Sequence, residues 1–315
     1  MPDPVSRRTL LASAALLAGR AAAAAGNSRA QLPICAFSKH FQWTDWKGTA
    51  GLCAEIGYDG VDLTVRKGGH VLPERVADDL PRAVEAVQAA GLAVPMITAG
   101  IVDVHSEHAE AIVKTASALG IKRYGWGGFR YDTSKSIPQQ IAEFKTRSKA
   151  LADMNKQYGA CAMYHTHSGI GQFGASMWDI WMVVKDLDTS AVGVNLDIGH
   201  ATVEGGFGGW INSTRLLLPV TRGIAVKDFR WERTGAQWRP HWCALGDGMV
   251  NFGEFFRMVK AAGFAGPLQL HMEYDELGGA DSGKTQMSIT KEQFLAIAKR
   301  DLQRLREVLR ETGIS

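Results

Sequence analysis

The sequence has 315 residues, of which 46% are hydrophobic and 21% are charged, and its formal net charge is +3. This length and hydrophobic content are sufficient for one large hydrophobic core. A nearly neutral chain gives no electrostatic reason to bind nucleic acid or an anionic membrane surface, so we expect small-molecule partners.

The first 25 residues have the pattern of an export signal. Arg7 and Arg8 precede an apolar stretch from Thr9 to Gly19, and a tract of small residues follows. The apolar stretch is shorter than the roughly 20 residues that span a bilayer. The alternatives are a short membrane anchor or a frayed helix, but the paired arginines favour a twin-arginine signal peptide over residues 1–25. We therefore expect a periplasmic protein that inserts stably into no membrane once the signal is removed.

From residue 32 onward, β-rich runs alternate with segments of helical periodicity. The eight β-rich runs span 32–38, 60–65, 93–100, 122–128, 160–167, 191–197, 222–228 and 266–273. A helix-like segment follows each run, and several of these segments end in glycine, as helices often do. Eight such units over residues 32–315 predict an α/β fold, a single-domain (β/α)8 TIM barrel. A doubly wound sheet would need a glycine-rich loop after its first strand, and CAFSKHFQW contains no glycine.

The last three predicted strands each have one apolar and one polar face. The polar faces end in Asp197, Lys227 and Glu273, and alternate residues of a barrel strand point inward. Buried carboxylates are costly unless they are paired or bind a metal, and barrel active sites lie at the carboxyl ends of strands. These residues therefore indicate an active site. Salt bridges with a purely structural role, such as Lys227 with Glu273, are the alternative.

Histidines lie near the same strand ends. His165 and His167 share one face of the fifth predicted strand, and His200 lies three residues beyond Asp197. His241 lies in the loop expected before the eighth strand. Histidine and carboxylate ligands together suit Mn²⁺, Zn²⁺, Fe²⁺, Co²⁺ or Mg²⁺ without selecting among them.

Five motifs at these strand ends resemble the xylose isomerase-like barrel superfamily, which contains sugar isomerases and epimerases, inosose dehydratases and endonuclease IV relatives. The motifs are YHTHSG (164–169), NLDIGHA (195–201), AVKDFRW (225–231), LGDGMVNF (245–252) and LHMEYD (270–275). The set is most similar to the inosose dehydratase-like branch and covers nearly the whole chain after residue 32. The resemblance implies one divalent metal at the ends of strands five to eight.

The resemblance also implies roles for single residues. Asp197 and Glu273 match two metal ligands, and His200 matches a position that commonly contacts a substrate oxygen. Lys227 and Asp228 match a Lys-Asp pair in which the lysine often polarises or binds the substrate.

Two positions depart from the superfamily pattern. His165 and His167 replace a glutamate that many relatives carry on strand five, and Ala225 replaces a histidine of strand seven. We expect the metal to be held by His167, Asp197 and Glu273, supplemented by His200 or His241.

The chemistry implied by the resemblance begins with removal of a proton next to a carbonyl, with a metal-stabilised enediolate. We predict an isomerase or epimerase of a free sugar, keto-sugar or cyclitol, with catalytic residues Glu273, Lys227, His165 and His200. Export argues against a phosphorylated substrate, and the single clear glutamate argues against an epimerase that uses two.

Three alternatives stay open at this stage. The first is a keto-sugar or inosose-type dehydratase or lyase, and the second is a non-catalytic exported sugar-binding barrel. The third, an endonuclease, would need about three metals and a basic groove, which the near-neutral charge does not favour. The substrate, the metal and the oligomeric state stay undetermined.

Overall fold

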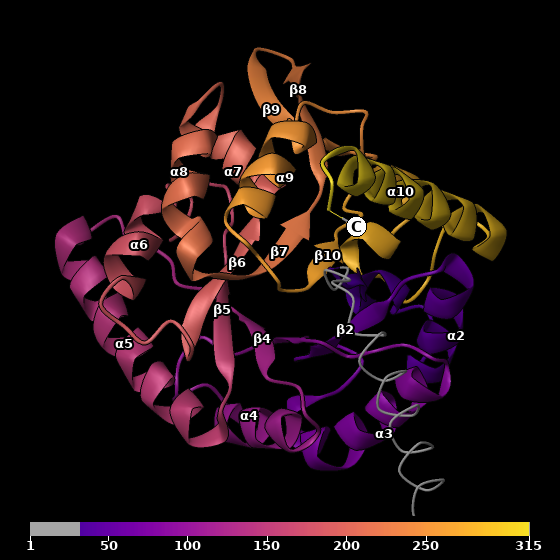
Figure 1. Cartoon of the computed structure of the whole chain (residues 1–315), viewed down its shortest axis with the longest axis horizontal. Coiled ribbons are helices and arrows are strands. Elements are labelled where there is room, and N and C mark those ends of the chain that lie inside the picture. The colour runs from indigo at the N-terminus through magenta and orange to yellow at the C-terminus, as the bar shows by residue number, and fades with distance from the viewer. Residues whose placement is uncertain (1–31, 315) are drawn as a thin grey trace, which may run out of the picture. The chain divides into compact units, whose positions relative to one another are not determined.

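Eight parallel strands close into a barrel in a computed structural model of the chain, which describes residues 32–314 (Figure 1). The predicted signal segment, residues 1–25, lies outside the described residues. The barrel strands are β1 (Ile34–Phe37), β2 (Gly60–Val65), β3 (Ile97–Ala99), β4 (Arg123–Trp126), β5 (Cys161–His165), β6 (Val192–Asp197), β7 (Thr221–Val226) and β10 (Leu268–Leu270). Because β1 pairs with both β2 and β10, the barrel is closed and the predicted (β/α)8 architecture is confirmed.

Helices surround the barrel (Figure 1). They are α2 (Trp46–Ile56), α3 (Val76–Ala89), α4 (Ala109–Ala118), α5 (Ile137–Tyr158), α6 (Trp178–Val184), α7 (Ile198–Gly205), α8 (Gly209–Leu217), α9 (Phe252–Ala261) and α10 (Lys291–Glu311). Short 3₁₀ helices are η1 (Ser38–Phe41), η2 (Pro73–Arg75), η3 (Leu218–Val220), η4 (Asp275–Leu277) and η5 (Ala280–Ser282). Within residues 32–314, no helix combines the length and apolar character that crossing a bilayer requires.

Local sequence explains where several helices begin and end. Thr290 and Gln293 form a reciprocal capping box at the start of α10, which satisfies two otherwise free backbone donors. Gly57 and Gly159 follow α2 and α5 with φ of 100° and 58°. Glycine adopts this left-handed conformation without steric cost, so these predicted helix ends are confirmed.

A β-hairpin after β7 was not predicted. It consists of antiparallel β8 (Asp228–Thr234) and β9 (Gln237–Cys243), and it projects away from the barrel strands (Figure 1). The turn contains Gly235 at φ 63°, a glycine between two runs rich in Trp and Phe. That pattern is typical of a hairpin, and the sequence prediction had taken the region after β7 for a loop and a helix.

Asp228, the first residue of β8, fixes the segment that follows the hairpin. Its carboxylate accepts hydrogen bonds of 2.8–3.1 Å from four backbone N–H groups, those of Phe229, Gly246, Gly248 and Val250. A Cβ at Gly248 would lie 2.2 Å from Asp228 Oδ1, so only glycine fits there. The aspartate of the Lys-Asp pair therefore has a structural role in this chain.

We predict that Asp228→Asn lowers the free energy of unfolding by about 2–3 kcal/mol, because the amide NH₂ would face backbone donors that now bind a carboxylate. Urea unfolding followed by circular dichroism measures this loss. The control is Asp247→Asn, which changes an exposed carboxylate in the same segment. Equal losses in the two variants would contradict the anchoring role of Asp228.

Candidate active site

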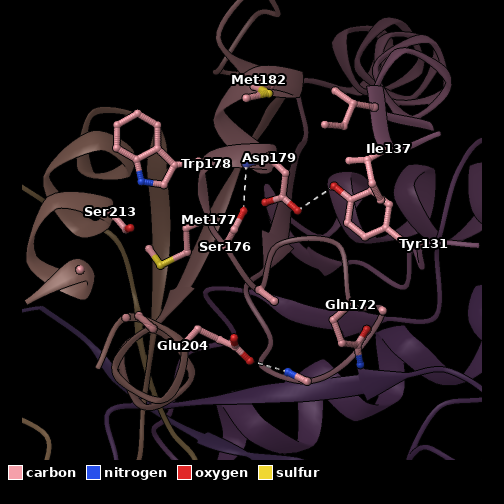
Figure 2. Close-up of a pocket in the computed structure, with 17 residues that line it drawn as sticks. Tyr131, Ile137, Gln172, Ser176, Met177, Trp178, Asp179, Met182, Glu204 and Ser213 are labelled. Carbon is pink, nitrogen blue, oxygen red and sulfur yellow. Dashed lines mark hydrogen bonds between the residues drawn. The ribbon is translucent and has the colours of Figure 1, made fainter. Parts of the chain in front are cut away.

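Two cavities stand out in the described part of the chain, and their linings differ in chemistry. The larger, of about 660 Å³, lies among α5, α6, α7 and α8 (Figure 2) and is lined by no histidine, lysine or arginine. Two of its carboxylates already accept hydrogen bonds, Asp179 from Tyr131 (2.9 Å) and Glu204 from the Gly169 backbone (2.7 Å). Three of the predicted catalytic residues, His165, Lys227 and Glu273, line the second cavity instead.

The second cavity, of about 440 Å³, opens at the carboxyl ends of the barrel strands. Its walls include His165 from β5, Lys227 after β7, and His271 and Glu273 after β10. The volume suits a small ligand such as a monosaccharide. Glu273 is the only carboxylate among its lining residues.

Asp197 has two separate roles at the junction of β6 and α7. Its Oδ1 accepts a 2.9 Å hydrogen bond from the backbone N–H of His200 and so caps α7. Its Oδ2 is fully buried and has no hydrogen-bond partner among residues 32–314. A buried β-strand can therefore end in a carboxylate, because one oxygen starts a helix while the other faces the interior of the barrel.

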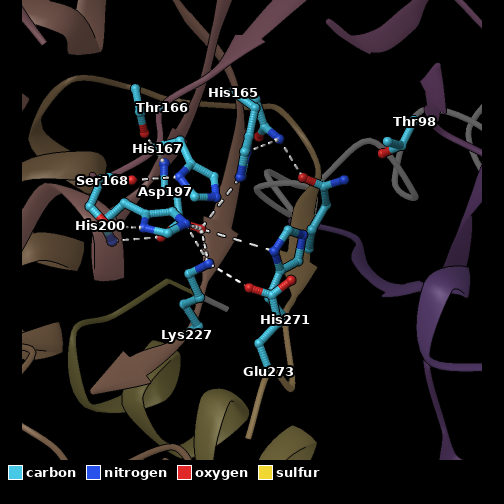
Figure 3. Close-up of polar contacts among 12 residues, drawn as sticks. Thr98, His165, Thr166, His167, Ser168, Asp197, His200, Lys227, His271 and Glu273 are labelled. Atoms are coloured by element: carbon cyan, nitrogen blue, oxygen red, sulfur yellow. Dashed lines mark hydrogen bonds and ion pairs between the residues drawn. The ribbon is translucent and has the colours of Figure 1, made fainter. Parts of the chain in front are cut away.

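Four nitrogen atoms surround the Oδ2 atom of Asp197 (Figure 3). They are Nζ of Lys227 (3.3 Å), Nε2 of His165 (3.7 Å), Nδ1 of His271 (3.9 Å) and Nε2 of His200 (4.0 Å). Burial raises the pKa of Asp197 to about 6, against the opposing effect of the Lys227 ammonium. The carboxylate is therefore ionised at neutral pH.

The donor atoms of this cluster fit a divalent metal. Ligand atoms of His165, Asp197 and His200 all lie within 4.8 Å of one another. Burial lowers the pKa of His165 to about 3 and that of His200 well below its usual value, so both imidazoles are neutral, as metal ligands must be. Both ring nitrogens of His271 are buried without a hydrogen-bond partner in the described residues. One carboxylate oxygen with two or three neutral imidazoles suits a transition metal such as Zn²⁺ or Mn²⁺.

Lys227 is a buried cation that connects both carboxylates of the site. Its ammonium donates to Glu273 Oε2 at 2.7 Å and to His200 Nε2 at 2.6 Å. Because an ammonium only donates, His200 carries its proton on Nδ1 and donates it to the Ser168 hydroxyl at 2.7 Å. Burial alone would lower the pKa of Lys227, but Asp197 and Glu273 raise it. Lys227 therefore stays protonated.

Glu273 is held by two lysines rather than by the histidine cluster. Its Oε1 accepts from Lys39 at 2.5 Å and its Oε2 from Lys227. Burial alone would raise the pKa of Glu273, but the Lys227 ammonium, with a smaller contribution from Lys39, holds it well below its usual range. The carboxylate is therefore ionised and faces the cavity.

A network of polar side chains in the barrel interior contacts Nδ1 of His165 and orients its ring. The Asn195 amide lies 3.3 Å from His165 Nδ1 and donates to Gln269 at 2.5 Å. Gln269 donates in turn to Asp62, which also accepts from Thr98 at 2.7 Å. This contact at Nδ1 leaves His165 Nε2 directed toward Asp197 Oδ2, 3.7 Å away.

The structure brings together five of the predicted site residues, Asp197, Lys227, Glu273, His165 and His200, around one cavity and the buried cluster beside it. His167, also predicted, lies exposed at the rim, where its ring is 3.9 Å from that of His200 and its Nδ1 donates to the Ser168 carbonyl.

His241 is not brought to this cluster, in contrast to the sequence-based expectation. It lies in β9, opposite Arg230, and its Nδ1 is 3.5 Å from Glu232 on the same hairpin. The expected loop is a strand, and strand pairing directs this side chain to the hairpin.

His271 was overlooked by the sequence analysis. It lies two residues before Glu273 on the same polar face of the last strand, and this spacing was the available signal. Its ring stacks on Phe37 at 4.6 Å, which fixes its orientation beside Asp197.

Residues 50–308 match the family described as xylose isomerase-like TIM barrel. The chain belongs to this xylose isomerase-like TIM barrel family. The comparison with curated proteins found no match to this sequence.

Solved structures of other proteins share the fold. A xylose isomerase-like TIM barrel protein from Mycobacterium smegmatis, in complex with magnesium, is 17% identical, with TM-score 0.64 over 90% of this chain and 98% of that one. D-allulose 3-epimerase from Methylomonas sp., in complex with D-allulose, is 15% identical (TM-score 0.63; 88% and 97% covered). The probable 3-DHS dehydratase AsbF from Bacillus anthracis is 14% identical (TM-score 0.63; 87% and 98% covered). At these identities the likeness shows the fold alone.

We predict that His165→Ala and Asp197→Asn each weaken Zn²⁺ binding by more than about 100-fold, because each removes a donor atom from the cluster. Calorimetric titration of chelator-treated protein with ZnCl₂ measures the affinity without any activity assay. His241→Ala is the matched control and should bind like the unaltered chain. Loss of binding in His241→Ala alone would place the metal at the hairpin instead.

Proposed function

We propose that this chain is a metal-dependent isomerase or epimerase of free sugars or keto-sugars that removes a proton from a carbon next to a carbonyl. The observation that carries the proposal is the buried Oδ2 of Asp197. It accepts no hydrogen bond in the described residues, and it is surrounded by imidazoles and the Lys227 ammonium beside a cavity that contains one ionised carboxylate. Family membership and the structural likeness to a sugar epimerase support it.

His165, Asp197 and His200, with His271 beside them, are the residues that would hold the metal. When bound, a divalent metal supplies Lewis acidity that polarises a carbonyl and stabilises negative charge on neighbouring oxygens. The neutral histidines leave the Asp197 carboxylate as the only formal negative charge among these four groups, so the loaded centre would be positive and attract electron-rich substrate oxygens.

Glu273 is the proposed base. It is ionised, faces the cavity and is the only carboxylate among the lining residues. Two ammonium contacts make it a weak base in the free protein. When a substrate hydroxyl or carbonyl oxygen takes over the Lys227 contact, the carboxylate loses one stabilising partner and its pKa rises. Substrate binding would thus bring the pKa of the base closer to the working pH.

Lys227 is the proposed electrophile that acts beside the metal. Its ammonium is already buried and oriented by Asp197 and Glu273, so it needs little reorganisation to donate to an oxygen that gains negative charge as the enediolate forms. His200 Nε2 accepts from the same ammonium, and it would give up this contact on binding the metal, because a neutral imidazole has one nitrogen lone pair.

A dehydratase or lyase is the second candidate, and one observation favours it. Epimerisation by two opposed carboxylates needs a second carboxylate in the cavity, and the lining contains only Glu273. His167 also lines the cavity and is not among the residues proposed to hold the metal, so it could contact a leaving hydroxyl there. The probable 3-DHS dehydratase AsbF from Bacillus anthracis shares this fold.

Export is proposed together with this activity. The sequence of residues 1–25 supports passage to the periplasm through the twin-arginine route, and sugar phosphates are mainly intracellular. We therefore propose unphosphorylated sugars, keto-sugars or cyclitols as substrates.

We predict that the metal-loaded protein incorporates solvent deuterium into one of these compounds, at the carbon next to the carbonyl. Mass spectrometry of a panel incubated in D₂O detects the label, and product analysis separates an isomerised sugar from an eliminated one. A folded, metal-loaded protein that binds panel sugars without exchanging hydrogen would instead favour a non-catalytic binding barrel.

We also predict that Glu273→Gln reduces the exchange rate by about 10²–10⁴-fold, because the amide cannot accept the proton. The matched control is Glu276→Gln, which alters an exposed glutamate three residues away and should leave the rate unchanged. Full activity in Glu273→Gln would show that another group is the base.

A further inference from the structure

One cation in the wall of the catalytic cavity has no counterion. Arg66 is the residue directly after β2, it is partly buried, and it lines the same cavity as Glu273 and His271. Within residues 32–314 its guanidinium makes no hydrogen bond and no ion pair. The guanidinium carbon lies 5.7 Å from the centroid of the Phe37 ring.

The two other cations that line this cavity, Lys39 and Lys227, already contact carboxylates. Both donate to Glu273, and Lys227 also lies 3.3 Å from Asp197 Oδ2, so two carboxylates balance these two ammonium groups. Asp62 acts electrostatically on Arg66 but forms no ion pair with it in the described residues. Its Oδ2 accepts from Thr98 and Gln269, and its buried Oδ1 has no hydrogen-bond partner there. Arg66 therefore leaves an excess of positive charge that faces the cavity.

Burial of this guanidinium has a cost that nothing in the described residues offsets fully. Burial lowers the pKa of Arg66, and Asp62 and Glu273 counter this only from a distance. Arginine stays protonated in proteins all the same. A charged group that loses water without gaining a partner is unfavourable, and a ligand of opposite charge would relieve that cost.

Phe37 lies near both Arg66 and the imidazole cluster. Its ring stacks on His271 with the centroids 4.6 Å apart, and the Arg66 guanidinium carbon is 5.7 Å from the same ring centroid. The cation and the cluster therefore share one phenyl ring as a neighbour. Gly100, which also lines the cavity, would place a Cβ 3.2 Å from the Arg66 Cβ, so the missing side chain keeps space open next to Arg66.

We propose that Arg66 binds a carboxylate at the end of the substrate remote from the reacting carbonyl, so that the site takes sugar acids rather than neutral sugars. This inference rests on the proposed function for the identity of the site. A guanidinium fork matches a carboxylate through two parallel hydrogen bonds. A single unpaired cation balances a monoanion, whereas a phosphate dianion would need further donors that Glu273 already occupies.

The test compares hexuronates with the hexoses of the same configuration. D-glucuronate, D-galacturonate and D-mannuronate are titrated calorimetrically into the metal-loaded full chain, alongside D-glucose, D-galactose and D-mannose. At least one uronate should bind about tenfold or more tightly than its hexose, as expected for a charge-assisted pair. Arg66→Met should remove that difference by weakening the binding of the uronate far more than that of the hexose.

Lys67→Met is the matched control because it removes the adjacent, exposed cation and should keep the preference for the uronate. The inference is overturned if no uronate binds more tightly than its hexose, or if Arg66→Met retains the preference. Hexose 6-phosphates form a further arm. Binding of these alone, lost in Arg66→Met, would identify a phosphate site and also overturn the carboxylate assignment.

Binding and turnover separate this inference from the proposed function. Uronate binding that depends on Arg66, without deuterium exchange, would refute the proposed reaction and leave the carboxylate site standing. Deuterium exchange into neutral sugars, with no preference for uronates, would support the proposed reaction and refute the carboxylate site.

Discussion

The buried ion pair between Asp197 and Lys227 is the interaction on which the site depends. Each group is fully buried, and each would be too costly alone in the barrel interior. Asp197 Oδ1 is satisfied by the start of α7, so Oδ2 alone faces Lys227 at 3.3 Å. Lys227 then extends the charge balance to Glu273. Two carboxylates can therefore stay ionised beside a cavity, together with histidines that burial keeps neutral.

This pair also explains why histidines rather than further acids surround Asp197. A third carboxylate near Oδ2 would add negative charge that one ammonium could not balance. Neutral imidazoles add donor atoms without adding charge, and His165 and His200 both carry pKa values lowered by burial. The charge of the centre in the metal-free protein is thus close to neutral, and a bound cation would make it positive.

Strand periodicity was sufficient to predict the barrel and the convergence of Asp197, Lys227 and Glu273, because inward-facing positions at parallel strand ends must meet. The same reasoning failed for His241, since its location depends on the β8–β9 pairing, which a prediction of eight strands did not include. His271 was missed for a different reason. Its spacing from Glu273 placed it on the polar face of the last strand, but its burial beside Asp197 depends on stacking with Phe37 from the far end of the sequence, which strand periodicity does not predict.

The alanine at position 225 is best understood as part of a rearranged interior. Ala225 pairs in register with Asp197 on one side and Gln269 on the other, and Gly223 pairs with Asn195. A Cβ at Gly223 would lie 2.9 Å from Asn195 Oδ1, so the small residues of β7 leave the space in which Asn195 reaches across to Gln269. A histidine at position 225 would compete for that space. The chain thus lacks a metal-binding histidine on β7 and instead has the Asn195–Gln269 hydrogen bond, which orients His165. His271 places an imidazole beside Asp197 from the neighbouring strand. Loss of one ligand position in the sequence therefore does not imply loss of the metal site.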